Sequence, residues 1–326
     1  MEKKKEIKVQ YVGFWNGFDF NKSRIHQILE KNYNVIISDK PDYVFCSIFN
    51  NEFLKYEDAI RIFYCGENIT PDFNLYDYAI AFDQIQFGDR YFRLPNYLAN
   101  LKYEEDLKNV NNRRNSNYLD DKRKFCCIVC SNGNADKMRQ TIVDEISKYK
   151  IVDSGGRYRN NIGHPNGVDN KLEFQRNYKF VLALENASFN GYITEKIVEA
   201  FAAGGIPIYW GAPDIEKYFN PKAFINAMSF SSIDALVDRI KEIDENDDLY
   251  NEYISEMPMQ KNYFWDTEFS QLEKFICNII EQPLNKARRR QNCSWTKKIE
   301  NMILLSDKGK KETVWGKIKK KTKKIV

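Results

Sequence analysis

Histidine is nearly absent from this chain of 326 residues and occurs only at His26 and His164. Serine or cysteine catalytic triads need a histidine base, and many metal sites use histidine as a ligand. The scarcity therefore argues against both kinds of site. If the protein performs acid–base chemistry, carboxylates are expected to carry it.

Three common nucleotide-binding patterns are missing as well. No predicted strand is followed by GxGxxG, no GxxxxGK[ST] occurs, and no two aspartates stand at positions i and i+2. A dinucleotide-binding fingerprint, a P-loop and a metal-bridging aspartate pair are thereby disfavoured. A site that needs no metal and neutralises phosphates with arginine, lysine and a helix N-terminus fits better.

Long apolar runs are also lacking, and none reaches the length of a membrane span. Residues Glu2 to Glu6 are charged where a signal peptide would begin, so we expect a cytoplasmic protein. The seven cysteines include one CxxC pair, Cys127 and Cys130, with no second pair to complete a zinc site. We expect this pair to act as small buried hydrophobes rather than as metal ligands.

What the sequence does contain is a strand–loop–helix–strand unit between Tyr178 and Pro213. Residues 180–184 are apolar at every position, as in a strand buried on both faces, and 206–210 predicts the next strand. Thr194 is expected to cap the intervening helix. Open α/β sheets bind ligands at the carboxyl ends of their strands. Five polar residues fall there: Glu185, Asn186, Tyr192, Glu195 and Lys196.

Strands and helices alternate in two blocks along the chain, which predicts an α/β protein with two facing Rossmann-like domains and a cleft between them. We expect strands at 7–12, 35–38, 43–47, 61–65, 78–82, 125–130, 151–153, 180–184, 206–210 and 224–227. Helices are expected at 23–31, 136–148, 195–203, 233–243 and 247–257. The polar stretch from Leu101 to Lys124 predicts a linker, giving domains 1–120 and 121–285, followed by a basic amphipathic tail at 286–326.

The charged residues near the expected site leave alternatives open. Lys196 could supply a point charge for phosphate, or it could pair with Glu199 at i+3 on an exposed helix face. Glu195 cannot hold phosphate but could bind the hydroxyls of a ribose or a sugar. Arg139 offers a planar fork for phosphate, although its position alone favours an ordinary surface arginine.

The stretch FVLALENASFNGYITEKIVEAFAAGGIPIYWGAP resembles the signature of the α-1,3-fucosyltransferases. VDSGGRYRNN, GENITPDFNLYDYAIAFD and the FNPKAFIN that follows YWGAP resemble the bacterial branch, so the similarity extends over both predicted domains. The resemblance implies a GT-B fold, GDP-fucose as donor, an N-acetylglucosamine-containing acceptor and transfer with inversion. It implies no required metal, and we expect no nucleic-acid partner.

The family's functional residues are carried over onto matching positions. The resemblance implies Glu67, in the GEN segment, as the catalytic base, in an N-terminal domain that binds the acceptor. For GDP-fucose binding by the C-terminal domain it implies Arg139, Asn186, Tyr192, Glu195 and Lys196. Trp15 could be an acceptor platform, because an aromatic face packs on the C–H face of a sugar, or it could be a core anchor.

These expectations predict transfer of L-fucose to the 3-hydroxyl, or the 4-hydroxyl, of N-acetylglucosamine in a lactosamine-type glycan, as in Lewis antigens on lipopolysaccharide. Two rivals remain: a GT-B transferase that uses another nucleotide sugar such as GDP-mannose, and a non-catalytic module that binds glycans or membranes. The tail begins with Arg288–Arg290 and ends in KIKKKTKKIV. Its lysines, interleaved with Trp315, Ile318, Ile325 and Val326, predict binding to the anionic inner face of a membrane; a solvated terminus is the alternative.

Overall fold

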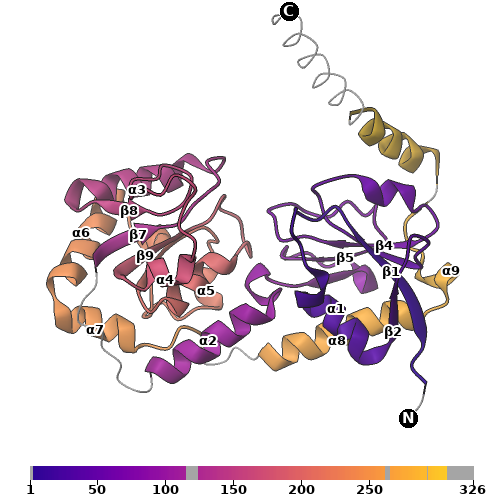
Figure 1. Ribbon diagram of the computed structural model, residues 1–326, viewed down its shortest axis with the longest axis horizontal. Coiled ribbons are helices and arrows are strands. Elements are labelled where there is room, and N and C mark those ends of the chain that lie inside the picture. Colours follow the sequence, from indigo (N-terminus) through magenta and orange to yellow (C-terminus); the bar gives the residue numbers. More distant parts are fainter. Residues whose placement is uncertain (1–2, 115–123, 261–264, 292, 307–326) are drawn as a thin grey trace, which may run out of the picture. The chain divides into compact units, whose positions relative to one another are not determined.

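The computed structural model describes residues 3–114, 124–260, 265–291 and 293–306. Its internal contacts divide the chain into two units (Figure 1). Unit 1 comprises residues 1–81, 85–92 and 270–326, and unit 2 comprises residues 82–84 and 93–269. Within the described ranges, no helix combines the length and the apolar character needed to cross a bilayer.

Unit 1 is built on a six-stranded sheet with the order β2-β1-β3-β4-β5-β6. Its strands are β1 (Glu6–Val12), β2 (Asn34–Ile37), β3 (Tyr43–Cys46), β4 (Ile60–Tyr64), β5 (Tyr78–Ala81) and β6 (Tyr91–Arg93). Strands β1 to β5 pair in parallel, so their carboxyl ends meet at one edge. The loops that carry Trp15 and Glu67 leave from this edge.

The helices of unit 1 include one that sequence patterns did not predict. Helix α1 (Arg24–Asn32) was expected, and it buries Ile25 and Leu29. Helix α8 (Trp265–Glu281) was not; its residues from Ser270 onward belong to unit 1, where Leu272, Ile276 and Ile279 are buried. A short α9 (Leu284–Ala287) and a helix at 294–306 follow.

The residues just after α9 belong to the segment 286–326, which was predicted as a basic amphipathic tail, and they are bonded to the rest of unit 1. Asp77 is fully buried and accepts hydrogen bonds from the backbone N–H groups of Arg289, at 2.7 Å, and Arg290, at 2.8 Å. The Arg290 guanidinium pairs with the same carboxylate, and Arg61 lies 2.6 Å from Glu300. The charges of Arg290 and Arg61 are therefore paired with carboxylates of unit 1. Trp315, Ile318, Ile325 and Val326 lie outside the described residues, and the prediction for that part of the tail stays untested.

Unit 2 contains a five-stranded parallel sheet with the order β11-β10-β9-β7-β8. Its strands are β7 (Lys124–Ile128), β8 (Val152–Ser154), β9 (Tyr178–Leu184), β10 (Ile206–Trp210) and β11 (Ile225–Asn226). Its helices are α2 (Leu101–Arg114), α3 (Lys137–Tyr149), α4 (Lys171–Gln175), α5 (Glu195–Ala202), α6 (Ile233–Glu245) and α7 (Asp247–Ser255). The apolar run that predicted a strand buried on both faces is β9, at the centre of this sheet.

The polar stretch read as a linker is largely helical, which corrects the sequence prediction. Helix α2 contacts α5 and buries Leu107 and Val110. Apolar residues are few in this charged segment, so its helical periodicity is weak. Packing against α5 explains why this segment is nonetheless a helix, since tertiary contacts supply most of the stability of an ordinary helix.

Candidate functional site

The loop after β9 is organised by a buried carboxylate, that of Glu185, which has no exposed surface. It accepts hydrogen bonds from the Thr194 backbone N–H at 2.7 Å and from the Thr194 hydroxyl at 2.8 Å. The Lys196 ammonium donates to it at 2.8 Å. Burial raises the pKa of Glu185, and the charge of Lys196 opposes that rise. Sequence analysis placed Glu185 in the polar cluster but assigned it no role.

The partner of Lys196 settles one alternative. Lys196 pairs with Glu185, whereas Glu199 pairs with Lys171 at 2.5 Å, so the alternative in which Lys196 pairs with Glu199 on an exposed helix face is wrong. Burial by itself would lower the pKa of Lys196, but the carboxylates of Glu185 and Glu195 outweigh burial and raise it. The ammonium is therefore held in its charged form at the N-terminus of α5, where a phosphate would be attracted.

Thr194 stands at the N-cap of α5, as predicted, but its hydroxyl bonds to Glu185 instead of capping the helix. Glu195, the first residue of α5, lies 3.8 Å from the Lys196 ammonium, and its side chain is 36% exposed. Burial alone would raise the pKa of Glu195, but the charges of Lys196 and Lys171 lower it. This site thus offers an ionised carboxylate that can accept hydrogen bonds from hydroxyl groups.

Arg139 is not a surface arginine, since it is only 4% exposed. Its guanidinium donates to the Asn186 side-chain oxygen at 2.9 Å and to the backbone carbonyl of Asn132. The Asp136 N–H donates to the Asn186 carbonyl at 2.8 Å and ties the start of α3 to the loop after β9. The structure therefore brings together two residues that the family resemblance assigns to donor binding. A guanidinium has more N–H donors than these two contacts use.

Tyr192 was predicted to bind GDP-fucose, but its side chain is buried and only 1% of its surface is exposed. Its ring packs edge-on against Phe82, with 5.2 Å between the ring centroids. It lies near enough to Lys196 to contribute to that residue's raised pKa. Tyr192 therefore lies in the core close to Lys196, and its electrostatic interaction helps to keep that ammonium group charged.

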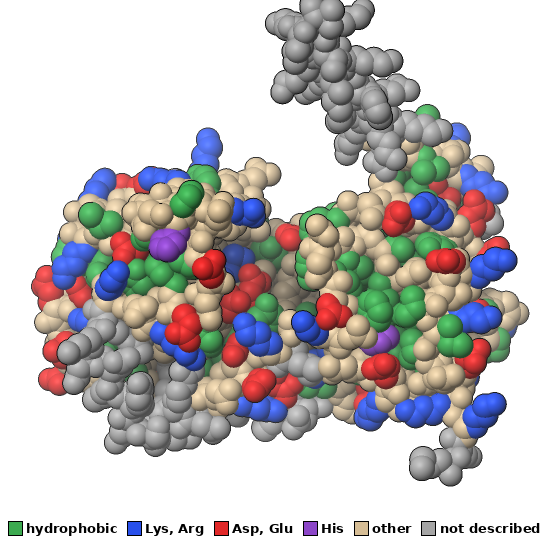
Figure 2. All heavy atoms as spheres, viewed as in Figure 1, with side chains coloured by type: hydrophobic (Ala, Val, Ile, Leu, Met, Phe, Trp, Pro, Cys, Tyr) green, Lys and Arg blue, Asp and Glu red, His purple; other side chains and the backbone are tan. Residues whose placement is uncertain are grey.

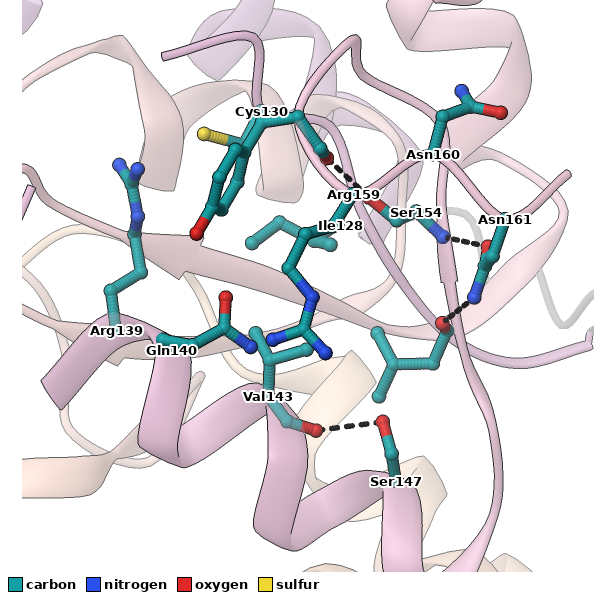
Figure 3. Close-up of a pocket in the computed structure, with 12 residues that line it drawn as sticks. Ile128, Cys130, Arg139, Gln140, Val143, Ser147, Ser154, Arg159, Asn160 and Asn161 are labelled. Atoms are coloured by element: carbon teal, nitrogen blue, oxygen red, sulfur yellow. Dashed lines mark hydrogen bonds between the residues drawn. The ribbon is translucent and has the colours of Figure 1, made fainter. Parts of the chain in front are cut away.

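Two hollows lie beside Arg139. One is a cavity of about 320 Å³ between α3 and the loop after β8, with Arg139, Gln140 and Arg159 around its polar side (Figure 3). The other, of about 330 Å³, opens beside the start of α3 and shares Arg139, Gln140 and Tyr158 with the first. Pockets of this size are typical of small-ligand sites. The buried arginine thus borders space that a ligand could fill.

The predicted residues of unit 1 lie in loops at the carboxyl edge of its sheet. Trp15 is 51% exposed, so the core-anchor alternative is wrong. Phe49, which sequence analysis missed, is equally exposed; its ring lies 6.4 Å from that of Trp15, and its N–H bonds to the Gly13 carbonyl at 2.8 Å. Figure 2 shows hydrophobic side chains gathered over much of the visible face of unit 1.

Glu67 follows β4 at the same edge and is partly exposed. The turn around it is closed by the Ile69 N–H bonding to the backbone carbonyl of Glu67 at 2.8 Å. Within the described part of the chain, the structure forms no hydrogen bond to the carboxylate itself, so a capping role for that side chain finds no support. The carboxylate is thus available to a ligand.

Metal ligation was not expected from the sequence. Across the described residues, no three histidine, cysteine, aspartate or glutamate side chains come together as a metal site would require. Cys127 is fully buried, and burial raises the pKa of its thiol, as expected for a small core residue. Cys130 is half-buried, and its thiol donates to the Asn132 carbonyl at 3.1 Å.

Comparison with known proteins gives two family matches. Residues 9–100 match the α-(1,3)-fucosyltransferase FucT N-terminal domain, and residues 119–301 match the glycosyltransferase family 10 (fucosyltransferase) C-terminal model. The chain is 33% identical over 318 residues to the α-(1,3)-fucosyltransferase FucT of Helicobacter pylori, which covers 84% of this chain and 66% of that relative. A 4-galactosyl-N-acetylglucosaminide 3-α-L-fucosyltransferase 9 of Mus musculus is 30% identical over 45% of this chain and 41% of its own length. The chain thus spans less than two thirds of the length of these relatives.

Solved structures agree with the family matches. A crystal structure of an α1,3-fucosyltransferase superposes with a TM-score of 0.75 and 31% identity, covering 89% of this chain and 93% of that one. A crystal structure of an α1,3-fucosyltransferase with GDP-fucose gives a TM-score of 0.70 and 30% identity, covering 90% and 95%. The predicted GT-B fold is confirmed by this match and by the two parallel sheets. The chain belongs to glycosyltransferase family 10, the fucosyltransferases.

Proposed function

We propose that this protein transfers L-fucose from GDP-fucose to the 3-hydroxyl, or the 4-hydroxyl, of N-acetylglucosamine in a lactosamine-type glycan, with inversion at the anomeric carbon. The observation that carries the proposal is that two cations are held at the loop after β9. Arg139 bonds to Asn186, and Lys196 bonds to the neighbouring Glu185 and lies 3.8 Å from Glu195. Family membership, and the names of the relatives, support the donor and the type of acceptor.

The donor half of the reaction follows from the charges in unit 2. When the bond between the fucose anomeric carbon and the diphosphate breaks, negative charge grows on the departing GDP. Arg139, Lys196 and the N-terminus of α5 would stabilise that charge. Glu195, kept ionised by its neighbouring lysines, would accept hydrogen bonds from donor hydroxyls.

The acceptor half is assigned to unit 1. As the acceptor hydroxyl oxygen forms its bond to the anomeric carbon, its proton passes to the Glu67 carboxylate, which acts as general base. Trp15, with half of its surface exposed, would pack its ring against the C–H face of the acceptor sugar. In this scheme one carboxylate suffices, because inversion needs a single displacement.

The test is a transfer assay with the purified full chain. GDP-fucose and N-acetyllactosamine should give GDP and a fucosylated product whose linkage is read by NMR, whereas GDP-mannose should give no product. Product formation should survive EDTA, because the proposed site neutralises the diphosphate without metal. Transfer from GDP-mannose, or a requirement for added Mn²⁺, would contradict the proposal. Nucleotide binding without transfer to any glycan would favour a binding module.

We further propose that the basic segment Lys308–Val326 binds the anionic cytoplasmic face of a membrane. Support comes from its lysines and from the helix that precedes it, where Trp295 is 70%, Met302 61% and Leu305 65% exposed. Exposed apolar residues beside a basic segment suit a membrane interface. Deleting 308–326 should abolish salt-sensitive binding to phosphatidylserine vesicles and leave transfer to a soluble acceptor intact. Equal vesicle binding by both proteins would reject the anchor.

A further inference from the structure

The loop between β9 and α5, residues 186–194, is attached to the rest of unit 2 at its middle as well as at its ends. Gly191 lies in a turn of this loop, and its N–H donates to the Asp214 carboxylate at 2.7 Å. Asp214 is only 8% exposed, and hydrogen bonds from a backbone N–H to a carboxylate are among the stronger ones in proteins. This bond therefore fixes the middle of the loop.

A segment from earlier in the chain, residues 82–84, lies against the same point of the loop. Gly191 has a φ of +79°, and a Cβ there would lie 3.0 Å from the Phe82 carbonyl oxygen. The Phe82 ring contacts those of Phe189 and Tyr192, with 6.0 and 5.2 Å between the ring centroids. Only glycine adopts this backbone conformation readily, and a larger residue would push the loop away from the segment.

The carboxylate of Asp214 also bonds to this segment. Its second oxygen accepts a hydrogen bond from the side-chain nitrogen of Gln84. The residues 211–214 that carry the carboxylate are themselves held, because the Ala212 N–H donates to the Tyr209 hydroxyl at 2.9 Å. One carboxylate thus joins the loop before α5 to two other segments of unit 2.

The conformation of this loop matters for the donor, because Asn186 begins the loop and Glu195 and Lys196 follow it directly. We propose that Asp214 is a positioning residue for the donor site, and that its bonds to Gly191 and Gln84 hold the loop ready to bind the nucleotide. Without these bonds the loop samples more conformations, and the free energy needed to order it weakens binding. The inference rests on the proposed function for the identity of the nucleotide.

Calorimetric titration of the full chain with GDP tests this role. Asp214→Ala removes both hydrogen bonds and should weaken GDP binding about tenfold. Asp214→Asn keeps an oxygen for the Gly191 N–H, and the Gln84 amide can turn to accept from the new amino group, so its affinity should stay within about twofold of wild type. In transfer assays Asp214→Ala should raise the KM for GDP-fucose about tenfold and leave the KM for the acceptor unchanged.

Asp244 provides the matched control, since it is another buried carboxylate of unit 2. It pairs with Lys150 and with Lys179, which is near the start of β9 and so at the opposite end of that strand from the loop. Asp244→Ala should lower the free energy of unfolding without changing the affinity for GDP. Hydrogen exchange followed by mass spectrometry reports on the loop itself: peptides covering 186–194 should exchange faster in Asp214→Ala than in wild type, but not in Asp244→Ala.

The outcomes separate this inference from the proposed function. If the wild type transfers fucose but Asp214→Ala keeps normal GDP affinity, or Asp214→Asn is as impaired as Asp214→Ala, the positioning role is wrong and the function stands. Equal loss of affinity in Asp244→Ala also overturns the role, because general destabilisation then explains both effects. If the variants behave as expected but GDP-mannose is the donor used, the positioning role stands and the fucosyl donor falls. Absence of GDP binding in the wild type overturns both.

A second variant keeps the test decisive should Asp214→Ala not fold. Gln84 is exposed, so Gln84→Leu should fold while removing one of the two bonds that Asp214 makes. It should weaken GDP binding about threefold and speed exchange in 186–194. Unchanged affinity and exchange in this variant would contradict the role of Asp214. Circular dichroism of each variant confirms folding.

Discussion

Removing the charge of Lys196 should destabilise the protein as well as weaken nucleotide binding, because its partner Glu185 has no exposed surface. Removing one member of a buried ion pair typically lowers the free energy of unfolding by about 3–5 kcal/mol. Glu185 would keep its two hydrogen bonds from Thr194, at 2.7 and 2.8 Å, so the lower end, about 3 kcal/mol, is expected for Lys196→Met. Lys171→Met, which breaks a pair with more exposed members, should cost about 1 kcal/mol or less and is the control.

Urea unfolding followed by circular dichroism measures these changes in the free energy of unfolding. A double-mutant cycle that combines Lys196→Met with Glu185→Gln isolates the interaction energy of the ion pair. Burial raises the pKa of Glu185, and in Lys196→Met no ammonium opposes it. A carboxyl group whose folded pKa exceeds the unfolded value of about 4.3 binds its proton more tightly when folded. The free energy of unfolding of Lys196→Met should therefore fall, relative to wild type, as pH rises from that value through the folded pKa. A cost below that of the control, or one independent of pH, would refute this account.

Three further outcomes are expected. Glu67→Gln should lower kcat about 100-fold with GDP affinity unchanged, and near-normal kcat in the folded variant would remove Glu67 as the base. Arg290→Met removes the cationic partner of the fully buried Asp77, to which three backbone N–H groups still donate, and should lower the free energy of unfolding by about 3 kcal/mol. Arg288→Met, whose partner is fully exposed, should change that free energy little, and equal effects would show that burial is not the cause. Burial lowers the pKa of His26, so the unfolded state binds the proton more readily, and stability should decline as pH falls below about 6.5; His26→Gln should flatten that decline in denaturation curves at pH 7.5 and 5.5.

Hydrophobic periodicity was sufficient to predict a helix or a strand wherever the apolar pattern was strong within a short stretch of sequence. The apolar run at 180–184 predicted β9, and the expected helix at 195–203 that follows Thr194 corresponds to α5. A strand buried on both faces and an amphipathic helix each have a short-range sequence pattern. The same reasoning failed for α2, where the buried Leu107 and Val110 lie in a highly charged segment. It also missed α8, a helix whose partners come from a part of the chain far away in sequence.

The strand–loop–helix units, the polar residues at their ends and the family resemblance could all be recognised without a structure, because each depends on one contiguous stretch of sequence. Which charged side chains pair with one another could be seen only in the folded protein. Lys196 could have paired with Glu199 three residues away, yet it pairs with Glu185, which sits at the end of another element. Arg139 could have faced solvent, and the arginines at 288–290 could have begun a free tail. The burial and ion pairing of a charged side chain depend on residues from segments distant in sequence, and a local sequence pattern does not identify those residues.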